Sequence, residues 1–145
     1  MAPLAVFVCL VCLSFLADAL PAIPKSSTTW LISNFSLTLS PAQNSTSLLF
    51  SFTDPSPTSP TNLTCTSNTT ATTQACGPNR DVLFKVSEDL GEVVLRRRMS
   101  SNSTNMGTAR QATHWMEGVN MTETEAGRRY MRAEDWVFTV SSVSG

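Results

Sequence analysis

The stretch from Leu48 to Cys76, LLFSFTDPSPTSPTNLTCTSNTTATTQAC, decides the fold class of this chain. Its first residues alternate between apolar and polar side chains, which is the pattern of a half-buried β-strand. Prolines within residues 55–60 remove backbone donors and end that strand in a loop. Residues 61–66 then resume the alternation. The stretch therefore predicts two strands, the proline-rich loop between them, and a polar loop at residues 67–75.

The same alternation recurs on both sides of this stretch. Residues 30–39 change parity near Ser33 and Asn34, which predicts a β-bulge there. Further strands are indicated at residues 82–86, 93–99, 107–115 and 136–141. Residues 116–133 permit a helix, although their two glycines oppose a long one. We therefore expect an all-β fold, a compact antiparallel β-barrel or sandwich with at most one short helix.

The N-terminal residues have the pattern of a secretory leader. An apolar run from Leu4 to Leu13 precedes the small-residue triplet Ala17–Ala19, so we expect residues 1–19 to be a cleaved signal peptide. The alternative, a membrane-spanning helix, needs about 20 apolar residues, and this run is too short. Residues 20–29 are polar and proline-bearing, which indicates a flexible lead-in. Residues 30–145 are then one β domain of an extracellular, secreted protein.

The charge balance argues against partners that are attracted by a strong field. The chain has 10 basic and 11 acidic residues, for a formal net charge of −1. Loss of Asp18 with the leader brings this charge near zero. No field of either sign then attracts nucleic acid or an anionic membrane. We therefore expect no nucleic-acid partner, and no membrane association after the leader is removed.

Cys65 and Cys76 are the cysteines that remain once Cys9 and Cys12 leave with the leader. In an oxidising compartment two otherwise free thiols form a pair, so we predict a Cys65–Cys76 disulfide. The chain-entropy estimate for a loop near this size is about 3 kcal/mol of stabilisation. The bond is therefore expected to stabilise one corner of the domain.

The chain contains several N-glycosylation sequons, in which asparagine is followed two residues later by serine or threonine. There are six of them, at Asn34, Asn44, Asn62, Asn68, Asn102 and Asn120. In a secreted protein we expect glycan on some of these. Asn44, Asn68 and Asn102 lie in the clearest predicted loops. Asn34 lies within a strand and Asn62 beside the disulfide, where folding can bury the side chain before transfer.

Residues with catalytic or metal-binding chemistry do not assemble into a recognisable site. His114 is the sole histidine and both thiols are committed, which excludes a zinc site and Ser-His-Asp or Cys-His centres. Carboxylate pairs of the kind that glycoside hydrolysis uses occur at Glu88–Asp89, Glu123/Glu125 and Glu134–Asp135. Their neighbours are turn residues and arginines, which is typical of solvated surface charge. We expect no enzymatic activity, no metal and no cofactor.

The most concentrated charge is the run Arg96, Arg97 and Arg98. In a strand, Arg96 and Arg98 share one face and Arg97 points to the other. Outward arginines protect a sheet edge from pairing with another chain. Arg96 and Arg98 are also candidate partner-binding residues for an acidic protein or glycan.

Taken together, these segments resemble the Alternaria major-allergen-like β-barrel family of small fungal secreted proteins. The resemblance rests on the leader and on the segments TTWLISNFSLTL, SFTD, NLTC, VLFKV, VVLRRRM and DWVFTV, in that order. It implies a compact β-barrel with no established catalytic centre, in contact with plant hosts or with the fungal surface. The chain has fewer cysteines after its leader than the best-known members, so a disulfide-linked oligomer is not implied.

Our leading hypothesis is a secreted, non-enzymatic β-barrel protein, effector-like or allergen-like, that acts by binding at a host or fungal surface. Its partner would be a host or cell-wall protein or glycan. The alternative is a structural or adhesive cell-wall glycoprotein, which the Ser/Thr/Asn-rich loops also suit. A small hydrolase is a third and weaker reading, because it rests only on the presence of carboxylates.

Overall fold

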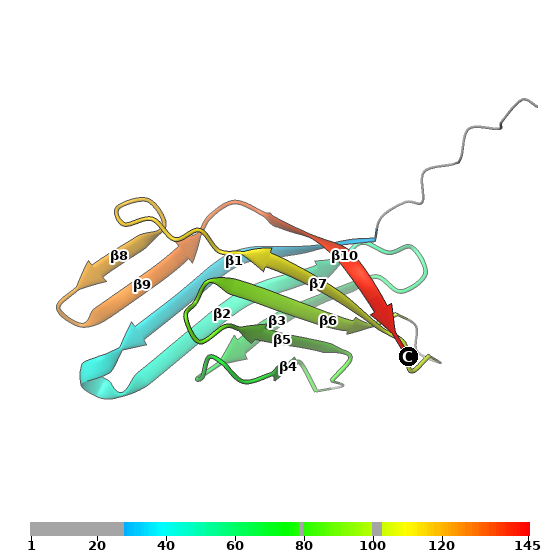
Figure 1. Cartoon of the computed structure of the whole chain (residues 1–145), viewed down its shortest axis with the longest axis horizontal. Helices are drawn as coiled ribbons and strands as arrows, with labels where there is room; N and C mark the ends of the chain where they lie inside the picture. Colours follow the sequence, from blue (N-terminus) through cyan, green and yellow to red (C-terminus); the bar gives the residue numbers. More distant parts are fainter. Residues whose placement is uncertain (1–27, 79, 100–102) are drawn as a thin grey trace, which may run out of the picture.

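A computed structural model describes residues 28–78, 80–99 and 103–145 (Figure 1). They contain ten β-strands and one short 3-10 helix, η1, which confirms the all-β prediction. The elements are β1 (Thr29–Ser40), η1 (Pro41–Gln43), β2 (Ser45–Asp54), β3 (Thr61–Ser67), β4 (Gln74–Cys76), β5 (Val82–Val86), β6 (Glu92–Arg98), β7 (Met106–Ala112), β8 (Met121–Thr124), β9 (Gly127–Arg132) and β10 (Trp136–Ser144). This described part has no helix with the length and apolarity needed to cross a membrane. The expected signal peptide lies outside the described residues.

The strands form one antiparallel sheet that curls into a nearly closed barrel. Their order is β3-β2-β1-β10-β7-β6-β5-β4, so β3 and β4 are the two edges. Cys65 of β3 and Cys76 of β4 form the predicted disulfide, with Cα atoms 4.7 Å apart. Along the described strands, these edges are therefore joined by a covalent bond and not by a hydrogen-bonded ladder.

On the side away from β2, β1 has two different partners along its length. Its first part, Thr29–Ile32, pairs with β10, and its second part, Phe35–Leu39, pairs with β9. The register with β2 shifts between Ser33 and Ser36, and Asn34 takes a φ of 54°. Asparagine tolerates this left-handed conformation better than most residues. The predicted bulge is thus present, and apolar side chains on both sides of it point into the barrel.

The helix that the sequence permits at residues 116–133 is not formed. β8 and β9 make an antiparallel hairpin there, and β9 lies alongside the second part of β1 (Figure 1). Gly127 begins β9 with a φ of 136°, which other residues rarely adopt. Tyr130 is buried, and its ring centroid lies 5.2 Å from that of Trp115. The hairpin therefore contacts the core through Tyr130, at an inward position of β9. A helix would instead need several apolar residues along one side.

The interior of the barrel is apolar and largely aromatic. Phe50 of β2 meets Phe84 of β5 edge-on at 4.9 Å between ring centroids, and Phe35 of β1 stacks on Phe50 at 6.1 Å. Such aromatic pairs add about 0.5–1.5 kcal/mol each beyond the burial of their surface. Strands from opposite walls thus contact each other through the core. The largest fully buried side chains are Trp30, Phe35, Phe50, Phe52, Phe84, Phe138, Ile32, Leu37, Leu48, Leu95, Val82 and Val86.

Candidate functional site

The arginine run of β6 is divided between the two sides of the barrel wall. Burial alternates along the strand, so that Arg96 and Arg98 are exposed whereas Arg97 is only 5% exposed. The predicted difference in parity is therefore observed. Arg97 is a core residue, and its two neighbours belong to the surface.

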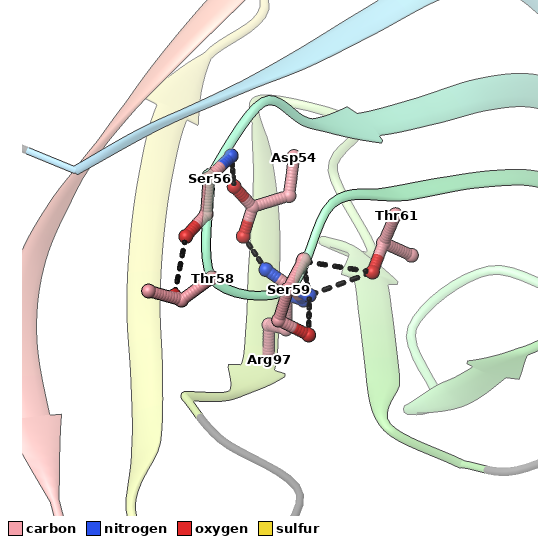
Figure 2. Close-up of polar contacts among 6 residues, drawn as sticks. All are labelled: Asp54, Ser56, Thr58, Ser59, Thr61 and Arg97. Carbon is pink, nitrogen blue, oxygen red and sulfur yellow. Dashed lines mark hydrogen bonds and ion pairs between the residues drawn. The ribbon is translucent and has the colours of Figure 1, made fainter.

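The guanidinium of Arg97 is held by the end of β2 and the start of β3 (Figure 2). Its Nη1 forms an ion pair with the buried carboxylate of Asp54. Its Nη2 donates hydrogen bonds to the carbonyl oxygen of Ser59 at 2.5 Å and to the hydroxyl of Thr61 at 2.6 Å. Burial lowers the pKa of Arg97, but arginine stays charged in proteins. Breaking such a buried pair is costly, because it leaves one charge uncompensated.

The same network fixes the proline-rich loop at residues 55–60. The second oxygen of the Asp54 carboxylate accepts a hydrogen bond from the backbone N–H of Ser56 at 2.8 Å. The hydroxyls of Ser56 and Thr58 lie 3.1 Å apart (Figure 2). The prolines of this loop cannot donate backbone hydrogen bonds to a neighbouring strand. The loop is instead held by the Asp54–Arg97 ion pair and by the hydrogen bonds that these two side chains form with it.

This buried pair was missed in the sequence, although a signal for it exists. Asp54 shares the parity of Phe50 and Phe52, and therefore faces inward. Arg97 shares the inward parity of Leu95. Two opposite charges at inward positions must find partners, because an unpaired buried charge is strongly unfavourable.

One surface hollow adjoins this region and a second lies at the other end of β2 and β3, and neither is lined by a free acid or base. One, of about 370 Å³, is lined by Thr28, Thr29 and residues 54–58. Its sole titratable group is the Asp54 carboxylate, which is already paired with Arg97. The other, of about 550 Å³, is lined by uncharged residues of β2, β3 and β4 and of the loop after β3: Ser47, Leu48, Leu49, Thr66, Ser67, Asn68 and Gln74.

The remaining residues with chemical potential are exposed and dispersed. His114 is exposed and lies in a loop. The carboxylates of the three sequence pairs are also exposed: Glu88, Asp89, Glu123, Glu125, Glu134 and Asp135. No group of three or more His, Cys, Asp or Glu that could hold a metal occurs among the described residues.

One of these carboxylates has a clear structural role. Asp89 accepts hydrogen bonds from the hydroxyl of Ser87 at 2.6 Å and from the backbone N–H of Gly91 at 3.0 Å, which lowers the pKa of Asp89. It therefore shapes the turn between β5 and β6.

Four exposed cations gather on the outer side of β5, β6 and β7, which we name the basic face: Lys85, Arg96, Arg98 and Arg110. Lys85 lies opposite Val94 in the ladder, and Val94 lies opposite Arg110. The other two arginines follow Val94 along β6 at every second residue, on the same side of the sheet. The predicted partner-binding residues Arg96 and Arg98 are thus part of a larger set that spans three strands.

Acidic residues compensate only part of the basic face. Arg98 forms an exposed ion pair with Asp81 at 3.1 Å, and Arg110 one with Glu92 at 3.6 Å. Exposed pairs of this kind contribute at most about 1 kcal/mol, so both arginines remain available to a partner. Within the described part of the chain, Lys85 and Arg96 form no ion pair.

The sequon asparagines differ in exposure. Four of them are exposed: Asn34, Asn44, Asn62 and Asn68. Asn120 is half-buried, and Asn102 lies outside the described residues. Asn34 and Asn62, which folding could have buried, are exposed, because the bulge of β1 and the outer side of β3 turn these side chains to solvent.

No protein-family model and no curated protein matches this sequence. Solved structures do match. The crystal structure of the Alternaria alternata allergen Alt a 1 aligns with 84% of this chain and 94% of its own, at a TM-score of 0.56 and 17% identity. The chain has the Alt a 1 fold. A second crystal structure, of the Alternaria alternata major allergen Alt a 1, covers 78% of this chain and 92% of its own, at a TM-score of 0.54 and 18% identity.

The Alt a 1 fold confirms the structural side of the resemblance seen in the sequence. At 17% and 18% identity the likeness establishes the fold alone. Because one fold hosts many functions, the activity of this chain must be argued from its own surface.

Proposed function

We propose that this chain is a secreted, non-enzymatic, allergen-like protein that acts by binding at a host or fungal surface through its basic face. The observation that carries the proposal is the gathering of Lys85, Arg96, Arg98 and Arg110 on one side of β5–β7. A chain with a formal net charge of −1 has no overall attraction for anions, so this local patch must supply it.

Extracellular location is supported by three independent features. The N-terminal sequence has the pattern of a signal peptide. The sheet is closed by a disulfide, which persists in oxidising compartments. The fold is that of proteins described as allergens.

A non-enzymatic role is supported by the state of the titratable groups. Asp54, the one buried carboxylate among the described residues, is neutralised by Arg97. A catalytic acid or base needs a shifted pKa and access to substrate. Neither of the two hollows described above is lined by His114 or by an exposed carboxylate, which favours binding over catalysis.

The chemistry of the basic face favours an anionic partner. Arginine binds carboxylates in a bidentate manner, and three of the four cations are arginines. Neighbouring strands are about 4.8 Å apart, so Lys85 and Arg110, two strands apart, lie about 10 Å from each other at their backbones. A surface polymer with regularly spaced carboxylates could contact several of the cations at once. Effector-like action on a host would follow from binding such a polymer at the host surface.

The proposal is tested by binding the secreted protein to polygalacturonate, an anionic wall polysaccharide. The double variant Lys85→Gln, Arg96→Gln removes the two cations of the basic face that form no ion pair in the described structure. At about 1 kcal/mol for each cation near an anionic surface, its affinity should fall at least about tenfold at low salt. The loss should shrink as salt screens the interaction.

A matched control is Arg128→Gln, Arg129→Gln, which makes the same change of net charge on the β8–β9 hairpin. It should leave the affinity within about twofold, because β9 pairs with β1 and β8 and with no strand of the basic face. Equal losses for both double variants would mean that only net charge matters, and would refute a dedicated basic face. If the unaltered protein were retained on duplex DNA as strongly as on polygalacturonate, recognition of a wall polymer would likewise be refuted.

A second candidate function is a structural or adhesive cell-wall glycoprotein. The exposed sequons and the uncharged outer side chains of β1–β3 favour this reading. Retention in the wall after mild extraction would support it, whereas free protein in the culture filtrate supports the binding protein.

A further inference from the structure

The outer side of β1, β2 and β3 contains no charged side chain. Among the residues of these three strands only Asp54 is charged, and it is buried. The outward positions are mostly serine and threonine, with exposed Leu49 between them. We name this surface the neutral face. It is the counterpart, on the other half of the barrel, of the basic face.

The four exposed sequon asparagines all belong to the half of the barrel that bears the neutral face. Asn34 lies in the bulge of β1, and Asn44 lies in the turn between β1 and β2. Asn62 is on β3, and Asn68 follows the end of β3. None of the sequons in the described residues lies on β5, β6 or β7. The sequence order of these sites does not reveal that they share one side.

The backbone at two of these sites also turns the side chain outward. Asn34 and Asn44 adopt left-handed conformations, with φ of 54° and 46°. In the described structure, the side-chain amides of Asn34, Asn44, Asn62 and Asn68 form no hydrogen bond with other described residues. Each amide is therefore free to carry a bulky substituent in the folded protein.

Asn120 differs from these four because it is half-buried and its side chain is hydrogen-bonded. Its Oδ1 accepts a hydrogen bond from the backbone N–H of Met116 at 2.7 Å, and its Nδ2 donates one to the carbonyl of His114 at 3.3 Å. Its own carbonyl accepts the N–H of Met131 at 2.8 Å. The side chain therefore holds the turn at residues 114–121 together. Contacts this local form within microseconds, so the turn competes with a modifying enzyme for the amide.

We propose that N-linked oligosaccharides are attached at Asn34, Asn44, Asn62 and Asn68 but not at Asn120, so that glycans cover the neutral face and leave the basic face open. This inference rests on the secretion that the proposed function includes.

The modification is a glycosyl transfer from a lipid-linked oligosaccharide diphosphate of the secretory pathway. The side-chain Nδ2 attacks the anomeric carbon of the donor sugar, and the bond from that carbon to the diphosphate oxygen breaks. A new C–N bond forms, Nδ2 gives up one proton to the enzyme's base, and the lipid diphosphate leaves. At Asn120 this step would use the nitrogen that already donates to His114.

The experiment maps glycopeptides of the full chain, expressed with its own N-terminal segment in a yeast host and recovered from the medium. The glycan-releasing amidase converts each occupied asparagine to aspartate, which mass spectrometry detects. We expect conversion at the four neutral-face sites in the large majority of molecules, and essentially none at Asn120. Conversion at Asn120, or none at the four sites, would overturn the inference.

The open basic face is tested separately in an Asn102→Gln background, because that sequon lies outside the described residues. Retention on polygalacturonate is compared before and after trimming by an endoglycosidase, which leaves one sugar on each asparagine and adds no charge, and should not change. Stronger retention after trimming would mean that glycans reach the basic face, and would overturn the one-sided arrangement.

Failure of this inference is distinguishable from failure of the proposed function. A protein with the expected glycan pattern that does not bind polygalacturonate refutes the binding role alone. A protein that binds, but carries glycan at Asn120 or lacks it at the four sites, refutes the one-sided arrangement alone.

Discussion

The two halves of the barrel share one interior but have different outer surfaces. On β1–β3 the outward side chains are uncharged and carry the exposed sequons, whereas on β5–β7 the outward positions carry four cations. Inward and outward positions alternate along each strand, so the outer surface can change while the core stays the same. Stability therefore depends on the inward side chains, whereas the proposed binding depends on outward side chains of the same strands.

Arg97→Met is expected to have the largest effect, because it breaks the ion pair that links the two halves. Asp54 would be left as an uncompensated buried charge, so the free energy of unfolding should fall by about 3–5 kcal/mol. Urea denaturation measures this loss. The neighbouring change Arg96→Met, on the basic face, should stay within about 0.5 kcal/mol.

The double change Asp54→Leu, Arg97→Met sharpens this test. Replacing both charges with apolar groups removes the penalty of the lone carboxylate, so stability should recover toward the starting value. A double variant no more stable than Arg97→Met would show that the hydrogen bonds to the loop, and not the charge pair, link the halves.

Cys65→Ala with Cys76→Ala is expected to have the next largest effect, because it removes the covalent link between the sheet edges. The free energy of unfolding should fall by about 3 kcal/mol on the chain-entropy estimate. Urea denaturation under non-reducing conditions measures it. Reduction of the unaltered protein is the control and should give a similar loss; an unchanged midpoint in both would mean that the barrel closes without the bond.

Asn120→Ala should have a smaller effect, confined to the β8–β9 hairpin. Two side-chain hydrogen bonds are lost, which corresponds to about 1–2 kcal/mol. Thr122→Ala is the matched control, because it destroys the same sequon but leaves the Asn120 side chain intact. If both variants lose equal stability, the amide does not hold the turn.

Asp89→Asn should have the smallest effect on stability, and this effect should be confined to the turn between β5 and β6. The pKa of Asp89 is lowered by its hydrogen bonds in the folded state, so its stabilisation is present above the ordinary value of 3.8. It disappears as the pH falls through the lowered pKa. The difference in melting temperature between the two proteins should therefore be seen at pH 6 and shrink toward pH 3, and a difference independent of pH would contradict this assignment.

The strands could be predicted wherever alternation was strong. The bulge of β1, the proline-rich loop and the β5–β6 hairpin follow from local parity and turn chemistry, which adjacent residues determine. The placement of β10 between β1 and β7 does not, because it depends on pairing between distant segments. The β8–β9 hairpin could not be predicted, because Tyr130 is its one fully buried residue. A single buried residue does not produce the alternation of apolar and polar side chains that marks a strand.

Individual residues of the candidate site could be predicted from the sequence, but their arrangement could not. Arg96 and Arg98 were identified from parity, but Lys85 and Arg110 join them only through the register of three strands. The sequons are readable as motifs, yet their sharing of one side depends on the tertiary fold. The Asp54–Arg97 ion pair could have been predicted, because both charged residues occupy inward positions and buried charges require partners.

The closure of the barrel also bears on self-association. β3 is an edge strand without a lysine, acidic residue or proline within Thr61–Ser67, so it lacks the usual guards against pairing with a second copy. In the described structure β4 lies beside this edge, and the disulfide keeps it there. A reducing environment would uncover an aggregation-prone edge, which makes the redox state a determinant of the protein's colloidal behaviour.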